Sequence, residues 1–94
     1  MLTNKQKKTL RAMAQSQRAI MQVGKDGLGS NSVKTLSDAL EAHELVKITL
    51  LKTCPIDVNE AAAYLCAQAN CELVQKIGKT LVFYRRSKKA KLEI

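Results

Sequence analysis

The tetrapeptide Gly24-Lys25-Asp26-Gly27 is the segment whose residue types could bind a charged ligand. It separates an apolar, β-branched run at 19–23, typical of a strand, from apolar residues that recur at helical spacing after Ser30. A glycine loop between a strand and a helix start exposes backbone N–H groups and the positive end of the helix dipole. The two glycines also keep side chains away from an approaching ligand. The pattern favours phosphate binding, with Lys25 as an added positive charge.

The overall charge strengthens that interpretation. The chain has 16 Lys and Arg against 8 Asp and Glu, which gives a formal net charge of +8. An excess of this size argues for a polyanionic partner. A lone G-x-x-G pattern marks ordinary tight turns about as often as ligand sites. The charge therefore decides in favour of a nucleic acid, although composition does not separate RNA from DNA.

Length and composition predict a single folded domain. The 94 residues, 46% of them hydrophobic, suffice for one domain at 1–94, with a core at about 3–86 and a basic, mobile tail at 87–94. No apolar run reaches the roughly 18 residues of a membrane span, and the N-terminal segment is too polar for a signal peptide. We therefore expect a cytoplasmic protein.

The three cysteines predict neither a metal site nor a disulfide framework. Their number is odd, they form no C-x-x-C pattern, and the single histidine, His43, is distant in sequence from Cys66 and Cys71. The favoured interpretation is that the cysteines are small, buried hydrophobic residues. We expect no metal and no cofactor.

Seven elements are predicted from apolar periodicity and turn residues. They are a helix at about 3–15, a strand at 19–23, a helix at 31–43, a strand at 45–51, a helix between 57 and 70, and two strands at 71–77 and 80–85. The order α-β-α-β-α-β-β indicates a small α/β domain in which helices cover one mixed sheet.

Capping residues predict where the helices begin and end. Thr3 with Gln6 has the spacing of a capping box, as does Asp57 with Glu60. Asn70 suits a left-handed helix stop. The N-cap of the second helix stays open among three candidates, Ser30, Asn31 and Ser32.

Three sequence blocks together resemble the CRM domain family, named for chloroplast RNA splicing and ribosome maturation, and most closely its stand-alone bacterial, YhbY-like members. The blocks are Gly24-Lys25-Asp26-Gly27-Leu28, His43-Glu44-Leu45-Val46-Lys47-Ile48 and the segment from Ile77 to Arg86. The resemblance implies a KH-like fold with a four-stranded mixed sheet, similar to the C-terminal domain of translation initiation factor three. For the bacterial members it also implies association with precursor large ribosomal subunits during ribosome assembly.

The resemblance implies that the G-x-x-G loop contacts RNA, and neighbouring cations would extend the surface. The expected RNA-binding residues are Gly24, Lys25, Asp26, Gly27, Leu28, Lys5, Lys7, Lys8, Arg11, Arg85 and Arg86. With only three aromatic residues available for stacking, we expect structured RNA read by shape. The expected partner is ribosomal RNA, bound by a monomer that has no membrane or small-molecule partner.

Other functions are weaker or stay open. A general DNA-binding protein explains the charge equally well, and only competition between folded RNA and duplex DNA would separate the two. An enzyme that holds a nucleotide phosphate is disfavoured, because the loop lacks the G-x-x-x-x-G-K-[ST] pattern and no nucleophile with a base can be assembled. A protein–protein adaptor is weakest, because no extended apolar stripe is left over.

Overall fold

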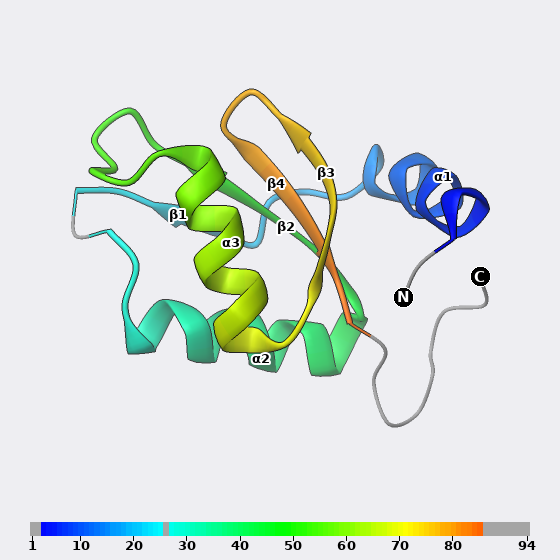
Figure 1. The fold of residues 1–94 in the computed structure, drawn as a ribbon, viewed down its shortest axis with the longest axis horizontal. Coiled ribbons are helices and arrows are strands. Elements are labelled where there is room, and N and C mark those ends of the chain that lie inside the picture. The colour runs from blue at the N-terminus through cyan, green and yellow to red at the C-terminus, as the bar shows by residue number, and fades with distance from the viewer. Residues whose placement is uncertain (1–2, 26, 86–94) are drawn as a thin grey trace.

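The structure is a computed structural model that describes residues 3–25 and 27–85. Seven elements follow one another in the predicted order, which confirms the predicted α/β class (Figure 1). They are α1 Asn4–Ala14, β1 Met21–Val23, α2 Ser30–His43, β2 Leu45–Leu50, α3 Val58–Ala69, β3 Glu72–Ile77 and β4 Thr80–Tyr84. Asp26, Arg86 and the tail predicted at 87–94 lie outside the described residues.

The four strands form one mixed sheet in the order β1-β2-β4-β3. β1 runs parallel to β2, whereas β4 is antiparallel to both of its neighbours. The register sets Val23 opposite Leu50, and Thr49 opposite Thr80. β1 and β2 therefore end, and β4 begins, at the same end of the sheet. We call this the loop end; it comprises the connections 24–29, 51–57 and 78–79.

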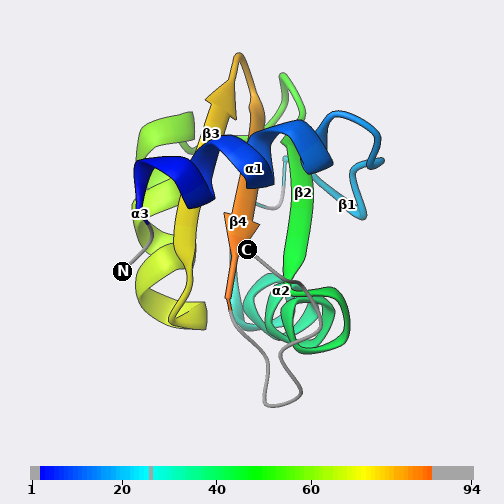
Figure 2. The same ribbon diagram turned by 90° about the vertical axis from the view of Figure 1, so that its right-hand side faces the viewer.

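Helices lie against both faces of the sheet (Figure 2). The cluster beneath α1 is formed by Leu10, Ala14, Leu45, Val74, Val82 and Tyr84. The larger cluster, beneath α2 and α3, is built around Leu36, Leu40, Ile48, Leu65, Leu81 and Phe83. Successive side chains of a strand point to opposite faces. The neighbours Phe83 and Tyr84 are consequently both buried, one in each cluster, and β4 is the central strand of the core.

Most of the predicted caps are present. Thr3 Oγ1 accepts a hydrogen bond from the Gln6 N–H at 3.1 Å, and the Gln6 side chain accepts from the Thr3 N–H at 2.9 Å, so this capping box is confirmed. Asp57 is the N-cap of α3, but its carboxylate accepts from the Asn59 N–H at 3.0 Å rather than pairing with Glu60. Asn70 adopts the predicted left-handed conformation, with φ 53° and ψ 53°.

The N-cap of α2 was predicted wrongly. The N-cap is Gly29, which offers no side-chain hydrogen bond, and all three predicted candidates lie inside the helix. β3 also begins one residue later than predicted, because the Cys71 N–H donates to the Cys66 carbonyl at 3.1 Å and so closes α3. Within the described residues, none of the helices is both long and apolar enough to span a bilayer.

Candidate nucleic-acid interface

The glycine loop leaves β1 through a tight turn. The Gly27 N–H donates to the Gly24 carbonyl at 3.0 Å, and Gly27 has φ +68°, a conformation that favours glycine. A Cβ built on Gly27 would lie 3.3 Å from Pro55 Cγ, whereas one on Gly24 would lie at an ordinary 3.5 Å from Leu51 Cδ1. The turn therefore uses the Gly27 N–H internally, and the loop offers fewer free amides than the sequence suggested.

Among the described residues, amides without a recorded partner lie instead at the start of α2. The Val33 N–H donates to the Gly29 carbonyl at 3.1 Å and is thus the first amide bonded within the helix. The amides of residues 30–32 precede it, and the N-cap glycine supplies no side chain to bond them. No acidic residue occupies the first turn of this helix. The arrangement suits an anion, since the helix dipole adds to the exposed donors.

Three exposed lysines gather at the loop end, one from each connection. Lys25 lies in the glycine loop, Lys52 follows β2, and Lys79 lies in the β3–β4 turn. The Leu51 N–H donates to the Val23 carbonyl, and the Leu50 N–H to the Lys79 carbonyl, both at 2.8 Å, so backbone hydrogen bonds hold the three connections together (Figure 1). In the described parts of the chain none of these lysines has a recorded ion pair.

The sequence analysis did not select Lys52 and Lys79 as site residues. Each lies in a polar connection far from the glycine loop in sequence, and only the strand order brings them to the same end of the sheet as Lys25. One signal was available. Parallel strands of one sheet end at the same edge, so the residues that follow β1 and β2 had to be neighbours once that pairing was assumed.

The basic side chains of α1 form a separate region. Lys5, Lys8 and Arg11 are exposed, and Lys7 is half-buried. α1 lies on the sheet face opposite α2 and α3, and at the far end of the molecule's longest dimension from the glycine loop (Figures 1 and 2). The structure therefore does not bring these four residues together with the loop end.

Arg85 makes several contacts within the fold, and its expected role as an RNA contact stays a prediction. Its Nη1 donates to the Ala69 carbonyl at 2.7 Å and to Ser37 Oγ at 3.1 Å. Its Nη2 donates to the Ser37 carbonyl at 2.9 Å and lies 3.5 Å from the Glu41 carboxylate. The guanidinium thus joins α2 to the end of α3. Arg86 and Asp26, also predicted, lie outside the described residues.

Leu28 joins the glycine loop to the core, and its expected role in RNA binding stays a prediction. It is half-buried and packs against the larger core cluster. Lys25, on the other side of the turn in sequence, is exposed.

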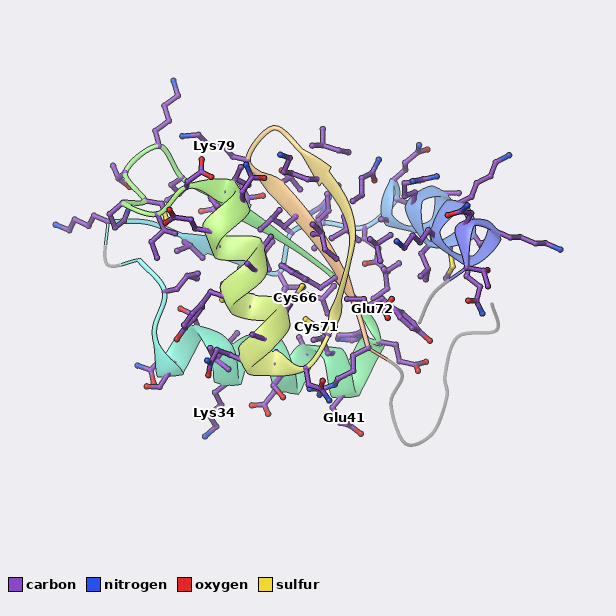
Figure 3. All side chains as sticks on the ribbon, in the orientation of Figure 1. Lys34, Glu41, Cys66, Cys71, Glu72 and Lys79 are labelled. Atoms are coloured by element: carbon purple, nitrogen blue, oxygen red, sulfur yellow. The ribbon has the colours of Figure 1, made fainter. Side chains whose placement is uncertain are left out.

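Two of the three cysteines, Cys66 and Cys71, lie close together. Cys66 and Cys71 are half-buried and lie side by side where α3 meets β3 (Figure 3). The Cys71 thiol donates to the Leu65 carbonyl at 3.7 Å. A hydrogen-bonding interaction with the Cys71 thiol lowers the pKa of Cys66 and raises that of Cys71, and burial adds to the rise at Cys71. Among the described residues there is no group of three or more His, Cys, Asp or Glu side chains placed to hold a metal ion.

Comparisons with known proteins agree with these features. The CRS1/YhbY (CRM) domain matches residues 2–85. The probable RNA-binding protein YqeI of Bacillus subtilis is 45% identical, over 97% of this chain and 95% of its own length. A probable RNA-binding protein of Pseudomonas aeruginosa is 34% identical, over 94% of this chain and 85% of its own length.

A solved structure shares the fold. The solution structure of a hypothetical protein from Staphylococcus aureus, described as a candidate RNA-binding protein, superimposes with a TM-score of 0.81. The two chains are 43% identical, and the match covers 97% of this chain and 95% of the other. The agreement extends over the whole sheet and the helices that pack on it.

Proposed function

The chain belongs to the CRS1/YhbY (CRM) domain family, and we propose that it binds structured RNA through the loop end of its sheet. The backbone of the RNA lies across the Gly24–Gly27 turn, where KH modules clamp about four nucleotides. The first amides of α2 and Lys25 contact its phosphates, and Lys52 and Lys79 add positive charge at the same end of the sheet. The names of the similar proteins, each an RNA-binding protein, support RNA over DNA as the partner.

One observation carries this proposal. Three connections that are distant in sequence each place one exposed lysine at the end of the sheet where the tight glycine turn leaves β1 and leads to the start of α2. A purely structural turn explains the left-handed glycine, but it does not explain three lysines at the same end of the sheet. Clustered positive charge next to free amides is the arrangement that phosphate favours.

We further propose that the RNA is ribosomal and belongs to a precursor of the large subunit, in the cytoplasm. This step rests on the resemblance of the three sequence blocks to the bacterial members of the family. Crosslinking in cells, followed by mapping of the attached nucleic acid, tests it. Enrichment at one position of large-subunit precursor RNA supports the proposal, and a scatter over the chromosome contradicts it.

The proposed role is binding by a monomer, without catalysis. His43 is exposed at the end of α2, and no hydrogen bond to a nucleophile is recorded for it among the described residues. A transition state needs donors, acids and bases placed around a reacting atom. The loop end offers lysines and amides, which suit a static polyanion.

Binding in solution is tested with a variant of the full chain that carries Lys25→Gln, Lys52→Gln and Lys79→Gln. We expect it to fold like the wild type and to bind folded ribosomal RNA more weakly at matched salt. Arg18→Gln, at an exposed position between α1 and β1 and away from the loop end, is the control and is expected to retain affinity. Equal affinity of the triple variant and the wild type would refute the loop end as the site.

A further inference from the structure

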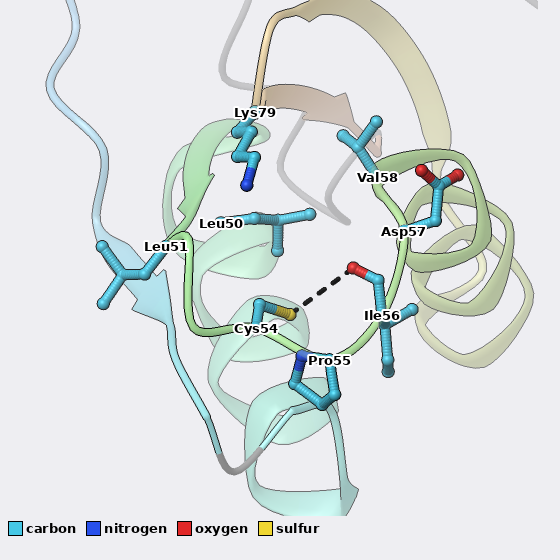
Figure 4. A pocket seen from close by; sticks show the side chains of 8 residues that line it. All are labelled: Leu50, Leu51, Cys54, Pro55, Ile56, Asp57, Val58 and Lys79. Atoms are coloured by element: carbon cyan, nitrogen blue, oxygen red, sulfur yellow. Dashed lines mark hydrogen bonds between the residues drawn. The ribbon is translucent and has the colours of Figure 1, made fainter.

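A pocket opens beside the glycine loop and has no role in the contacts described so far (Figure 4). Its volume is about 210 Å³, and it lies between the end of β2, the connection to α3 and the β3–β4 turn. Leu50, Cys54, Ile56 and Val58 line it with aliphatic and thiol groups. The Cys54 thiol is directed to the Ile56 carbonyl at 3.7 Å, so the floor is closed by a contact within the connection itself.

Two charged side chains add polar groups to this apolar lining. Lys79 extends over Leu50 toward the middle of the pocket (Figure 4), and no acceptor for its ammonium is recorded in the described part of the chain. Asp57 lines the side formed by the start of α3. One oxygen of its carboxylate accepts from the Asn59 N–H, which leaves further lone pairs for a ligand. A donor and an acceptor at the rim of an apolar hollow can orient a planar, polar-edged group.

The wall of the pocket is shared with the glycine loop. The Cβ position of Gly24 lies 3.5 Å from Leu51 Cδ1, and that of Gly27 lies 3.3 Å from Pro55 Cγ and 3.8 Å from Ile56 Cδ1. The loop therefore lies on one side of this wall and the pocket on the other. Leu51 is also 38% exposed, an apolar side chain left at the surface between the two.

We propose that the pocket holds one unstacked nucleobase, with guanine preferred, of the RNA whose phosphates contact the glycine loop. The inference rests on the proposed function and names the group recognised at that site. Charge complementarity supports the occupant, because Lys79 and its neighbours Lys25 and Lys52 attract the strand that carries the base. The shared wall means that a phosphate on the loop and a base in the pocket belong to nearby nucleotides.

The rim chemistry accounts for the base preference. Guanine presents two adjacent acceptors, O6 and N7, which suit the lysine ammonium, and an amino group that can donate to a carboxylate. Because the floor carries no aromatic ring, stacking contributes little and the edge contacts decide between bases. Adenine keeps N7 but presents an amino group in place of O6, so it loses one of the two acceptors for Lys79.

The test uses the full chain and two RNA hairpins that differ only in one bulged position, which is guanosine in one and abasic in the other. We expect the wild type to bind the guanosine hairpin roughly 5- to 100-fold more tightly, the range of one good base contact. In Lys79→Gln this ratio falls toward one. Lys25→Gln, the matched control, weakens both hairpins equally and keeps the ratio, because its contact is to phosphate alone.

Equal binding of the two hairpins by the wild type would overturn the base pocket while leaving the proposed function intact. The base pocket is likewise overturned if Lys79→Gln lowers the affinity for both hairpins by the same factor. If the wild type binds neither hairpin at low salt, the proposed function fails and this inference fails with it.

A second measurement does not depend on RNA affinity. Methyl NMR signals of Leu50, Leu51, Ile56 and Val58 are expected to shift during titration with guanosine 5′-monophosphate. Ribose 5-phosphate, which lacks the base, should leave these methyl signals in place. Methyl signals that do not shift with guanosine 5′-monophosphate, or that shift equally with both compounds, would contradict a base in the pocket.

Discussion

Arg85 reaches across the end of the sheet and donates a hydrogen bond to the Ala69 carbonyl at 2.7 Å. Ala69 is the last residue of α3, and the other bonds of the guanidinium go to Ser37 and Glu41 of α2. The Arg85 N–H also donates to the Glu44 carbonyl at 3.0 Å, just after α2. A single residue thus joins β4 to both helices that cover the larger core.

Replacing Arg85 with Leu should lower the free energy of unfolding by about 1–3 kcal/mol. The substitution keeps an apolar stem but removes every guanidinium donor, so the partly buried carbonyls that it served lose their partners. Urea denaturation measures the change. Lys34→Leu, at an exposed position of α2, is the control and should change stability by less than about 0.5 kcal/mol.

RNA binding distinguishes a role of Arg85 within the fold alone from a role as a phosphate contact. The slope of log affinity against log salt should be the same for Arg85→Leu and the wild type, at a temperature where both are folded. A slope reduced by about one would mean that Arg85 neutralises a phosphate after all.

The hydrogen bonds of Arg85 could not be predicted from the sequence. Arg85 opens a strongly basic segment that ends the chain, and such segments are usually solvated or bind anions. Its neighbours in space, Ser37 and Ala69, come from two helices that are distant in sequence. Only the packing of β4 between α2 and α3 creates the acceptors that the guanidinium uses.

Local signals, by contrast, were sufficient wherever the interacting atoms are close in sequence. Thr3 and Gln6 form their capping box across three residues, and Asn70 needs only its own left-handed conformation to end α3. The start of α2 was missed because its N-cap, Gly29, has no side chain to signal it. The lysine cluster at the loop end was missed for the opposite reason, since it depends on strand pairing over tens of residues.

The two glycines of the loop should respond differently to alanine. Gly27→Ala is expected to lower the free energy of unfolding by about 1–2 kcal/mol, because φ +68° is unfavourable for a residue with a Cβ. Its Cβ would also press on Pro55 at 3.3 Å. Gly24→Ala should be tolerated, because its nearest neighbours lie at ordinary contact distance. Thermal and urea unfolding of the two variants compares them.

Gly78→Ala provides the matched control for backbone strain. Gly78 has φ +56°, and nothing lies within 4 Å of its Cβ position, so alanine there adds strain without crowding. We expect Gly27→Ala to cost at least as much as Gly78→Ala. If Gly27→Ala proves neutral while Gly78→Ala destabilises, the turn at Gly24–Gly27 does not hold its left-handed conformation in solution.

The two basic regions should contribute independently to RNA affinity. Neutralising Lys25, Lys52 and Lys79 should flatten the slope of log affinity against log salt by up to ~2–3, and neutralising Lys5, Lys7 and Lys8 by a similar amount if each contacts a phosphate. Since the regions lie at opposite ends of the molecule, the effects of the two triple variants should add in the combined variant. Filter binding over a salt series measures all four proteins.

An unchanged slope for the α1 variant would restrict the RNA surface to the loop end and mark α1 as a solvated helix. An unchanged slope for the loop-end variant, together with a flattened slope for the α1 variant, would place the RNA-binding surface at α1 instead. Either result is informative because the structure keeps the two sets of lysines apart.

Cys66 should be alkylated at lower pH than Cys71. A hydrogen-bonding interaction with the neighbouring Cys71 thiol lowers the pKa of Cys66, while the same interaction and burial raise the pKa of Cys71. Thiolate is the reactive form, so the rate of modification by iodoacetamide should rise at Cys66 first as pH increases. Peptide mass spectrometry over a pH series identifies which residue carries the label.

Cys71→Ala removes the neighbouring thiol and tests whether that thiol causes the lowered pKa of Cys66. Without the hydrogen bond, the pKa of Cys66 should rise toward its ordinary value, and labelling of Cys66 at neutral pH should slow. Cys54→Ala is the control, because Cys54 bonds to the Ile56 carbonyl and not to this pair. Faster labelling of Cys66 in Cys71→Ala would show instead that Cys71 shields its neighbour from the reagent, so that access rather than thiolate stabilisation sets its reactivity.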